Sequence, residues 1–249
     1  DLCLKSVLGQ SVMPADVIIC DDGSGEATKT LVDEWKKKFP VPLIHIWQPD
    51  EGFQLAKIRN RGFAASASDY LVQADGDLIF HKDFIKDHNS LARPGYFTTG
   101  SRVLLSAQTT EALLQNKCIE IKKYASGDRN FFNSLRLPLL QPLLATRYKS
   151  AGRHKYYVKG CNMAFWKKDI IEVNGYNEDF TGWGREDSEM AIRLINAGIQ
   201  KQFLKFGGIS YHLYHREASR EMEETNIKKM QDAIEKKLVR SPLGISQYL

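Results

Sequence analysis

Two carboxylates stand one residue apart directly after a stretch that is predicted to be a buried strand. Asp75 and Asp77 flank Gly76, and the apolar residues 70–73 precede them. The glycine lets the turn tighten, so that the carboxylates can hold a hard divalent cation and leave positions open for phosphate oxygens. A solvated turn also fits this short pattern. Its place at a strand end favours a metal site, because crowded carboxylates repel one another unless a cation compensates.

Two histidines near the end of the chain are further candidate metal ligands. His212 and His215 lie three residues apart. A lone histidine pair also fits a surface or core position. Together with the acidic turn, however, the pair offers the carboxylate and imidazole set that suits Mn²⁺.

A second group of residues combines an aromatic ring with two acids. Trp183 lies between Gly182 and Gly184, and Glu186 and Asp187 follow at the predicted start of a helix. The glycines permit a mobile loop, the indole can stack on a sugar, and the helix N-terminus keeps Asp187 ionised to accept a proton. Ordinary capping by acids is the alternative, but it does not explain the tryptophan between two glycines.

The elements that must position these residues alternate along the first third of the chain. Hydrophobic patterns predict helices and strands in turn: a helix at 1–10 ending near Gly9, a strand at 16–20, a helix at 28–39, a strand at 43–47, a helix at 55–67 and a strand at 70–73. This order predicts an α/β fold with a doubly wound, mostly parallel sheet flanked by helices. Its ligands bind at the carboxyl edge, where Asp21 and Asp22 also fall. Because a helix normally follows a strand, we expect a first strand to be missing before residue 1.

The remaining segments are less regular. The patterns predict a strand at 96–105, a helix at 111–124, a stretch at 130–148 that its two prolines break, a helix that contains residues 190–195 and ends at Gly198, and an amphipathic helix at 217–240. No internal repeat or domain linker is visible.

The net charge of +5 over 249 residues is unevenly placed. Residues 112–159 hold ten Lys or Arg and two acids, so they carry +8 and leave −3 for the rest. This predicts an anionic partner, such as a membrane surface or a phosphate-bearing substrate, although a solvated surface also fits. Peripheral membrane contact through 112–159 is one interpretation, and a substrate-side subdomain is the other. No recognisable nucleic-acid-binding motif is present, so no nucleic acid partner is predicted.

Composition excludes a disordered or fibrous chain, since 43% of the residues are hydrophobic and 26% are charged. No apolar run reaches the roughly 18 residues of a membrane-spanning helix. The four cysteines are scattered without a C-x-x-C pair, which predicts neither a disulfide framework nor a zinc site. Cys20 is expected to be buried. A reducing cytoplasm is the predicted location, with peripheral contact at the inner face of the membrane.

Five ordered blocks together resemble family 2 glycosyltransferases of the GT-A fold. They are DVIICDDGSGE, DEGFQLAKIRNRGFAAS, YLVQADGD, KGCNMAFWKKD and FTGWGREDSEMAIRLINAG. The segment GWGREDSE resembles the galactosyltransferase-type carboxyl half of β-1,4-galactosyltransferases and chondroitin-polymerase-like enzymes. The resemblance implies bacterial polysaccharide biosynthesis and one Rossmann-like GT-A domain over 1–249. Residues 1–100 would form its nucleotide-sugar-binding half, 101–160 a variable segment, and 161–249 the acceptor-binding and catalytic half.

The resemblance also implies a role for each matching residue. Nucleotide-sugar-binding positions are Asp22, Lys57, Arg59, Asn60 and Asp75. Acceptor-binding positions are Asn162, Trp183, Gly184 and Glu186. Asp77 and His215 match the metal ligands, with His212 as the alternative histidine and Asp75 as a further ligand. Asp187 matches the catalytic base.

The implied reaction is a metal-dependent, inverting transfer of a sugar from a nucleotide-sugar, with uridine diphosphate as the expected carrier. Its acceptor is a hydroxyl of a saccharide or lipid-linked molecule, and its cofactor is Mn²⁺ or Mg²⁺. We expect residues 181–187 to close over the donor. Two alternatives remain at this point. A sugar-1-phosphate nucleotidyltransferase needs a glycine-rich phosphate loop that is not visible. A non-catalytic carbohydrate-binding protein needs Trp183 but has no use for Asp77, Asp187 and His215 together.

Overall fold

A computed structural model of the protein describes residues 1–216 and 219–249. The chain divides into two compact units, each built from three stretches that are separate in the sequence. Unit 1 comprises Asp1–Met13, Val72–Ala164 and Lys201–Glu217, and unit 2 comprises Pro14–Leu71, Phe165–Gln200 and Ala218–Leu249. The expected single domain with three successive parts stays a prediction. Among the described residues, no helix is both long enough and apolar enough to cross a membrane.

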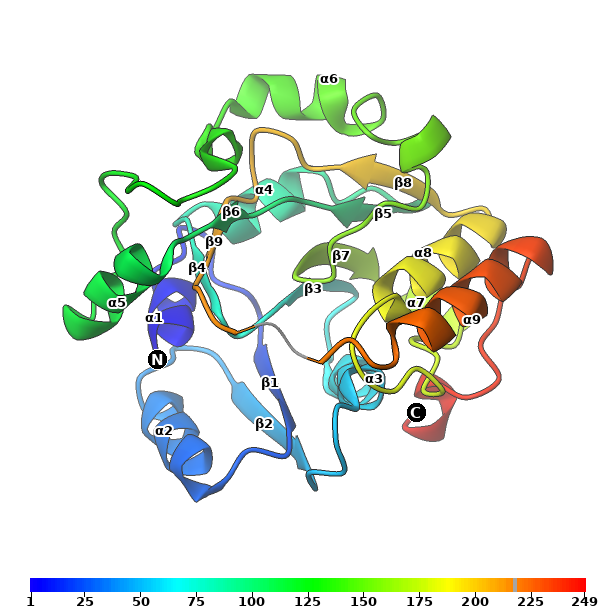
Figure 1. The fold of residues 1–249 in the computed structure, drawn as a ribbon, viewed down its shortest axis with the longest axis horizontal. Helices are drawn as coiled ribbons and strands as arrows, with labels where there is room; N and C mark the ends of the chain where they lie inside the picture. The colour runs from blue at the N-terminus through cyan, green and yellow to red at the C-terminus, as the bar shows by residue number, and fades with distance from the viewer. Residues whose placement is uncertain (217–218) are drawn as a thin grey trace. The chain divides into compact units, whose positions relative to one another are not determined.

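Unit 1 contains two sheets and the helices around them (Figure 1). Its elements are α1 (Leu2–Leu8), β3 (Tyr70–Ala74), β4 (Leu78–Phe80), α4 (Phe84–Ser90), β5 (Tyr96–Thr99), β6 (Val103–Leu104), α5 (Ala107–Gln115), η1 (Phe131–Ser134), η2 (Pro138–Leu140), α6 (Gln141–Ala145), η3 (Gly152–His154), β7 (Asn162–Trp166), β8 (Gln200–Phe203) and β9 (Ser210–His212). One sheet has the order β3-β7-β5-β8 and the other the order β4-β9-β6. Three of these strands, β3, β7 and β8, cross the boundary between the units, because residues 70–71, 165–166 and 200 are assigned to unit 2.

These sheets correct the prediction of a mostly parallel sheet. Strands β5 and β7 pair antiparallel, and so do β4 and β9, whereas β6 and β9 are parallel. The fold is therefore α/β with mixed sheets.

The β4–β9 pair matters most for function, because it joins strands far apart in the sequence and places Leu78 opposite His212. The ladder continues outward, since the Leu213 N–H donates to the Asp77 carbonyl at 3.0 Å.

The core of unit 1 packs against strand β4. Leu78 and Phe80 pack with Phe84 of α4 and Cys161, while Ile79 packs in a second cluster with Val103. Because all three β4 residues are buried, the strand is held on both faces. The residue that precedes it, Asp77, is thereby fixed at a strand end.

Unit 2 contains the alternating part of the chain. Its elements are β1 (Val17–Asp22), α2 (Glu26–Lys36), β2 (Leu43–Gln48), α3 (Leu55–Ala65), α7 (Lys167–Glu172), α8 (Glu186–Asn196), α9 (Glu223–Glu235) and η4 (Ile245–Gln247). Strands β1 and β2 pair in parallel, with Val17 opposite Leu43 and Asp22 opposite Gln48. The expected strand and helix alternation is confirmed here.

Helix α3 packs closely on β1 because one of its residues has no side chain. A Cβ on Gly62 would lie 2.3 Å from the Cys20 Sγ, so a larger residue would push the helix away. The Cys20 residue as a whole is exposed. Its sulfur nevertheless lies against α3, and burial there raises the pKa of the thiol to about 11.

Three predicted elements have other bounds in the structure. The helix expected at 111–124 is α5, which begins earlier because the Ser106 hydroxyl caps it by accepting from the Thr109 N–H. The strand expected at 96–105 is interrupted at Gly100 and forms β5 and β6 in different sheets. The terminal helix expected at 217–240 is α9, and the first two residues of that expectation lie outside the described part.

His88 gives the fold a predictable response to acid. Its ring is fully buried, and Nε2–H donates to the Asn162 Oδ1 at 2.9 Å. Burial lowers the pKa of His88 to about 4, although Asn162 and the Asp87 charge act in the opposite direction. The fold therefore favours the neutral ring.

We expect acid to destabilise the protein through this residue. Because the unfolded chain takes up a proton near pH 6.5 and the folded chain does not, stability is present above that pH and is lost as the pH falls toward 4. Between pH 7 and pH 5 the loss is about 2 kcal/mol. Urea unfolding of the wild type and of His88→Gln at both pH values measures it. Equal pH losses in the two proteins would contradict the assignment.

Candidate functional site

One carboxylate and two imidazoles converge in unit 1. His212 Nε2 lies 3.2 Å from the Asp77 Oδ2, and His215 Nε2 lies 2.9 Å from the same oxygen. The three potential ligand atoms all lie within 4.8 Å of one another. The pairing of β4 with β9 produces this arrangement, since it sets Asp77 beside the end of β9. We call these three residues the His–Asp cluster.

The orientation of His215 is fixed by a second hydrogen bond. Its Nδ1–H donates to the Arg216 carbonyl at 2.7 Å, which leaves Nε2 facing Asp77. In the neutral ring this Nε2 carries a lone pair, and a lone pair facing a carboxylate oxygen is repulsive. A proton or a metal cation between the two atoms removes the repulsion.

Asp77 remains ionised in this environment. Burial alone would raise its pKa, but the hydrogen bond from His212 and the charges of His212, His215 and Arg102 outweigh it and hold the pKa of Asp77 below its usual value. Its second oxygen, Oδ1, is buried and has no hydrogen-bond partner among the residues that the structure describes. A buried carboxylate oxygen without a partner is costly, which makes it a suitable metal ligand.

The donor set of the His–Asp cluster fits a divalent transition metal. Two imidazoles and one carboxylate supply three ligands and leave further positions for substrate oxygens. Mg²⁺ prefers oxygen ligands and keeps its water, so this set favours Mn²⁺. Asp75 is outside the three-residue group.

Arg102 is a residue of this region that the sequence analysis missed. Its guanidinium is half-buried and donates to the Cys161 Sγ at 2.9 Å. Burial would lower the pKa of Arg102, but Cys161 and the charges of Asp75 and Asp77 outweigh it and raise the value. Arg102 thus places a permanent positive charge near both predicted metal carboxylates. Nothing in its local sequence marks it, because it lies in the short link between β5 and β6.

A second cluster lies in unit 2 at the N-terminus of α8. The Arg59 guanidinium on α3 is 3.1 Å from the Glu186 Oε1, and their side chains are 7% and 12% exposed. Burial and the charge of the neighbouring Asp187 raise the pKa of Glu186, against the opposing effect of Arg59. The Asp187 Oδ1 accepts hydrogen bonds from the Ser188 N–H and hydroxyl. We call Arg59, Glu186 and Asp187 the acid–arginine cluster.

The segment before α8 is held at one end. Gly182, Gly184 and Arg185 all have left-handed backbone, with φ of 70°, 103° and 76°. The Gly182 N–H donates to the Phe53 carbonyl at 3.0 Å, so the expected mobile loop is anchored there. Trp183 is 36% exposed, and the Arg220 guanidinium lies 4.8 Å from the centre of its ring.

Asp22 is fixed at the carboxyl end of β1. Its Oδ1 accepts from the Gln48 side chain at 2.6 Å, and its Oδ2 accepts from the Gln54 N–H at 2.7 Å. Gln48 ends the neighbouring strand and Gln54 caps α3, so three elements position this carboxylate. Lys57, by contrast, is partly exposed and lies 3.7 Å from Glu51.

Two predicted ligand-binding asparagines instead hold the fold together. Asn60 is fully buried and bonds the Tyr176 N–H, the Tyr176 carbonyl and the Glu178 carboxylate. Asn162 is also fully buried and bonds His88 together with the carbonyls of residues 101 and 208. Since their amides are satisfied inside the protein, direct contact with a donor or an acceptor would require these bonds to break. We assign both a positioning role.

Replacing Asn60 by Ala tests this assignment. The change leaves buried groups without partners, so we expect the free energy of unfolding to fall by about 1 to 3 kcal/mol. Urea unfolding measures the loss, and calorimetry measures the donor affinity of the protein that remains folded. A large loss of donor affinity at unchanged stability would return Asn60 to the ligand-binding residues.

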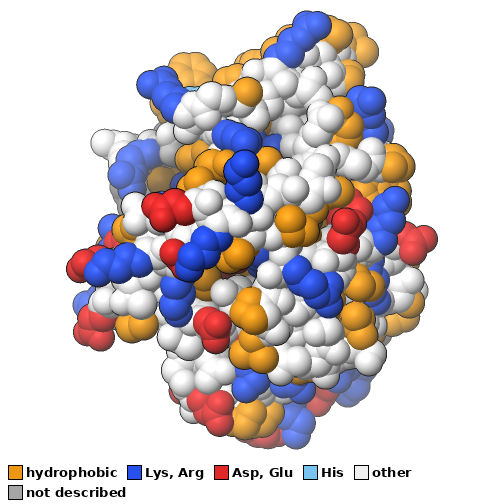
Figure 2. Space-filling view, turned by 90° about the vertical axis from the view of Figure 1, so that its right-hand side faces the viewer, with side chains coloured by type: hydrophobic (Ala, Val, Ile, Leu, Met, Phe, Trp, Pro, Cys, Tyr) orange, Lys and Arg blue, Asp and Glu red, His pale blue; other side chains and the backbone are white. Residues whose placement is uncertain are grey.

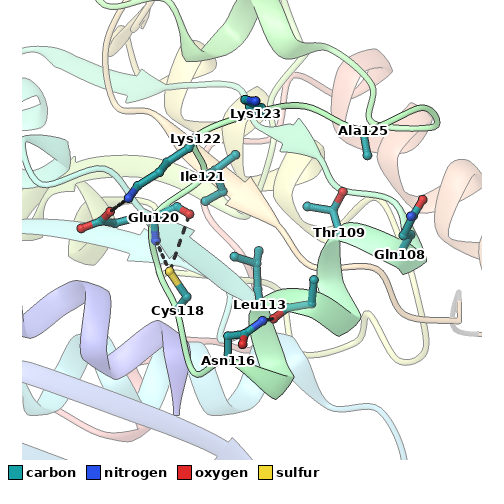
Figure 3. Close-up of a pocket in the computed structure, with 11 residues that line it drawn as sticks. Gln108, Thr109, Leu113, Asn116, Cys118, Glu120, Ile121, Lys122, Lys123 and Ala125 are labelled. Atoms are coloured by element: carbon teal, nitrogen blue, oxygen red, sulfur yellow. Dashed lines mark hydrogen bonds and ion pairs between the residues drawn. The ribbon is translucent and has the colours of Figure 1, made fainter.

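A separate hollow of about 420 Å³ lies in unit 1 (Figure 3). Thr109, Leu113 and Asn116 line it from α5 and its C-terminal end, and Glu120 and Lys122 line it from the following loop. Lys122 is already paired with Glu120 at 3.2 Å. None of the candidate catalytic, donor-binding, acceptor-binding or metal-binding residues lines this hollow, although Lys122 and Lys123 of the basic segment 112–159 do, so we do not assign the donor to it.

Comparison with known proteins defines the class. Residues 1–137 match glycosyl transferase family 2, and residues 143–216 match a family described as the N-terminal domain of galactosyltransferase. The first match covers more than half of the 249 residues. The chain therefore belongs to glycosyl transferase family 2, which confirms the resemblance of its sequence blocks.

Individual relatives are distant. The chain is 25% identical to the chondroitin synthase of Escherichia coli over 215 residues, which is 82% of this chain and 31% of the relative. It thus spans less than a third of that protein. Among solved structures, S. aureus TarS 1-349 in complex with UDP-GlcNAc has a TM-score of 0.62 at 12% identity, over 98% of this chain and 64% of that one. A mannosyltransferase from Pyrobaculum calidifontis in complex with GDP-Man and Mn²⁺ has a TM-score of 0.58 at 17% identity, over 86% and 52%. These structures confirm a GT-A-like fold.

Proposed function

We propose that this protein is a metal-dependent glycosyltransferase that moves a sugar from a nucleotide-sugar to a hydroxyl group of a saccharide or lipid-linked acceptor. One observation carries the proposal: two imidazoles face a carboxylate whose second oxygen is buried without a partner among the described residues. A non-catalytic carbohydrate-binding protein has no need for this arrangement. Family membership adds support from outside the structure.

The His–Asp cluster is the proposed site of the metal. Asp77, His212 and His215 supply the ligands, and their donor types favour Mn²⁺ over Mg²⁺. When bound there, Mn²⁺ supplies Lewis-acid neutralisation of the diphosphate leaving group, whose negative charge grows as the anomeric bond breaks. Arg102 adds a second positive charge next to Asp75 and Asp77, and we assign it to the diphosphate as well.

Asp187 is the proposed general base. It takes the proton from the acceptor hydroxyl while that oxygen attacks the anomeric carbon from the face opposite the diphosphate, so the configuration inverts. Asp187 lies in the first turn of α8. We assign Glu186 to a hydrogen bond with an acceptor hydroxyl; its raised pKa and its ion pair with Arg59 support this assignment. Trp183 and Gly184 complete the proposed acceptor-binding residues.

A uridine diphosphate carrier is the proposed donor type. The bond network around Asp22 keeps this carboxylate rigid at a strand end, which suits recognition of a nucleoside by hydrogen bonds. A similar fold binds UDP-GlcNAc in TarS, and another binds GDP-Man and Mn²⁺. Asp75 and Lys57 are the further proposed contacts of the donor.

A donor screen tests the proposal. We would measure release of nucleoside diphosphate from several UDP-sugars and from GDP-Man, with and without a saccharide acceptor, in Mn²⁺, Mg²⁺ or chelator. We expect acceptor-stimulated release with a UDP-sugar, fastest in Mn²⁺ and absent in chelator. Saccharide binding without release from any donor would instead support a carbohydrate-binding protein.

A further inference from the structure

Residues 131–143 expose an unusual amount of apolar surface. Of the eighteen large hydrophobic side chains recorded as exposed in the described residues, seven belong to these thirteen residues. They form what we call the apolar ridge: Phe131, Phe132, Leu135, Leu137, Leu139, Leu140 and Leu143. Leu139 is 89% exposed and Phe132 is 71% exposed. Monomeric soluble proteins rarely leave this much apolar surface uncovered, which indicates that a partner covers it.

Specific contacts hold the ridge segment in its observed position. Arg136 forms a bidentate ion pair with Asp87 at 2.7 to 3.2 Å, and it also contacts Asp83. The side chain of Gln141 is buried and donates to the Phe206 carbonyl at 2.8 Å. Ala145 packs in a buried cluster in the same unit. Polar side chains therefore anchor the segment to the rest of the unit, and its leucines are exposed to solvent. In an ordinary surface helix the apolar side chains face the core and the polar ones face solvent.

Basic residues flank the ridge, and acids are absent from that part of the sequence. No Asp or Glu occurs between Asp128 and Asp169. The exposed bases of this stretch are Arg129, Arg147, Arg153, Lys155 and Lys168, of which the first four belong to the same unit as the ridge. In the upper part of Figure 2, the end at which α6 lies in Figure 1, hydrophobic and basic side chains gather on the face shown. The surface thus combines apolar area with positive charge.

The combination of apolar surface and positive charge favours one kind of binding partner for the ridge over another. A second copy of the chain would bring two positive surfaces together, which is unfavourable in a two-fold interface. An anionic bilayer offers both a low-dielectric region for the leucines and phenylalanines and negative headgroups for the flanking bases. We propose that the apolar ridge docks the protein on an anionic lipid surface. This inference does not depend on the proposed transfer reaction.

Vesicle binding tests the proposal with the 249-residue chain. Phosphatidylcholine vesicles with and without 30% phosphatidylglycerol are sedimented with the wild type at low and high salt. The variant Leu139→Ser/Leu143→Ser removes two exposed leucines of the ridge, and its matched control, Val239→Ser/Leu249→Ser, removes two exposed hydrophobic residues elsewhere. A third variant, Arg147→Gln/Arg153→Gln, removes two flanking charges.

We expect the wild type to bind the anionic vesicles, with weaker binding at high salt and on neutral vesicles. The leucine variant should bind at least tenfold more weakly, the arginine variant about tenfold more weakly, and the control like the wild type. Circular dichroism checks that each variant is folded. Absence of binding to anionic vesicles, or equal binding by all variants, would overturn the proposal. A dimer in solution that the leucine variant abolishes would assign the ridge to a second copy instead.

Discussion

Replacing Asp77 by Asn is expected to lower the rate of sugar transfer about 10³-fold and to weaken Mn²⁺ binding strongly. The amide removes the negative charge on which His212 and His215 converge, and it leaves a poorer ligand at the centre of the His–Asp cluster. Loss of a Lewis acid costs several kcal/mol of transition-state stabilisation, and about 4 kcal/mol corresponds to this rate loss. Calorimetric titration with Mn²⁺ measures the affinity, and release of nucleoside diphosphate measures the rate.

Two comparisons make the Asp77 result specific. Glu111→Gln changes an exposed carboxylate in the same unit and should leave both quantities unchanged. His212→Ala and His215→Ala should each weaken Mn²⁺ binding at least tenfold, because each removes one of only three protein ligands in the cluster. If Asp77→Asn kept the Mn²⁺ affinity of the wild type, the metal assignment would be wrong. If only one of the two histidine variants lost Mn²⁺ affinity, that histidine and Asp77 would be the ligands, and the other histidine would not bind the metal.

Replacing Asp187 by Asn is expected to lower the transfer rate 10²- to 10⁴-fold while the Mn²⁺ and donor affinities stay near those of the wild type. The asparagine keeps the size of the side chain but cannot accept the proton of the acceptor hydroxyl. A positioned general base typically contributes this factor, which corresponds to about 3 to 5 kcal/mol. Single-turnover transfer measures the chemical step, and calorimetry measures the two affinities.

Variants of two other carboxylates distinguish the loss of a general base from the loss of a negative charge in this region. Asp179→Asn alters an exposed acid shortly before α8 and should transfer sugar at the rate of the wild type. Glu186→Gln should raise the KM for the acceptor more than it lowers kcat, since we assign Glu186 to acceptor binding. Full transfer activity in Asp187→Asn would refute the base assignment. Equal losses in Asp187→Asn and Asp179→Asn would point to electrostatics alone.

The sequence predicted those parts of the fold that depend on local patterns. The elements β1, α2, β2 and α3 were expected from hydrophobic periodicity, and the structure confirms each within a few residues. The acidic residues at strand ends were also visible in the sequence: Asp22 is the last residue of β1, and Asp77 directly precedes the buried strand β4. Sheet order was not predicted correctly. Antiparallel β4–β9 and β5–β7 pairs depend on contacts between residues more than sixty positions apart, which no local period records.

The burial of individual polar residues also could not be predicted from the sequence. Asn60 and Asn162 lie within blocks that resemble ligand-binding motifs, and the resemblance therefore predicts contacts with ligands. The structure surrounds both amides with backbone and side-chain partners. Arg102 was not predicted as a functional residue, because it lies between two short strands and belongs to no recognisable sequence motif.

The amino-acid sequence by itself determined which chemical groups the protein has, namely acids at strand ends, two histidines three residues apart and an acid pair at a helix start, because local spacing fixes which residues share a turn. Only the tertiary structure decided which of them meet. His212 and His215 reach Asp77 through the pairing of β4 with β9, and Glu186 reaches Arg59 through the placement of α8 beside α3. Such meetings depend on the free energy of long-range packing and strand pairing, which is distributed over many residues and is not encoded in any one motif.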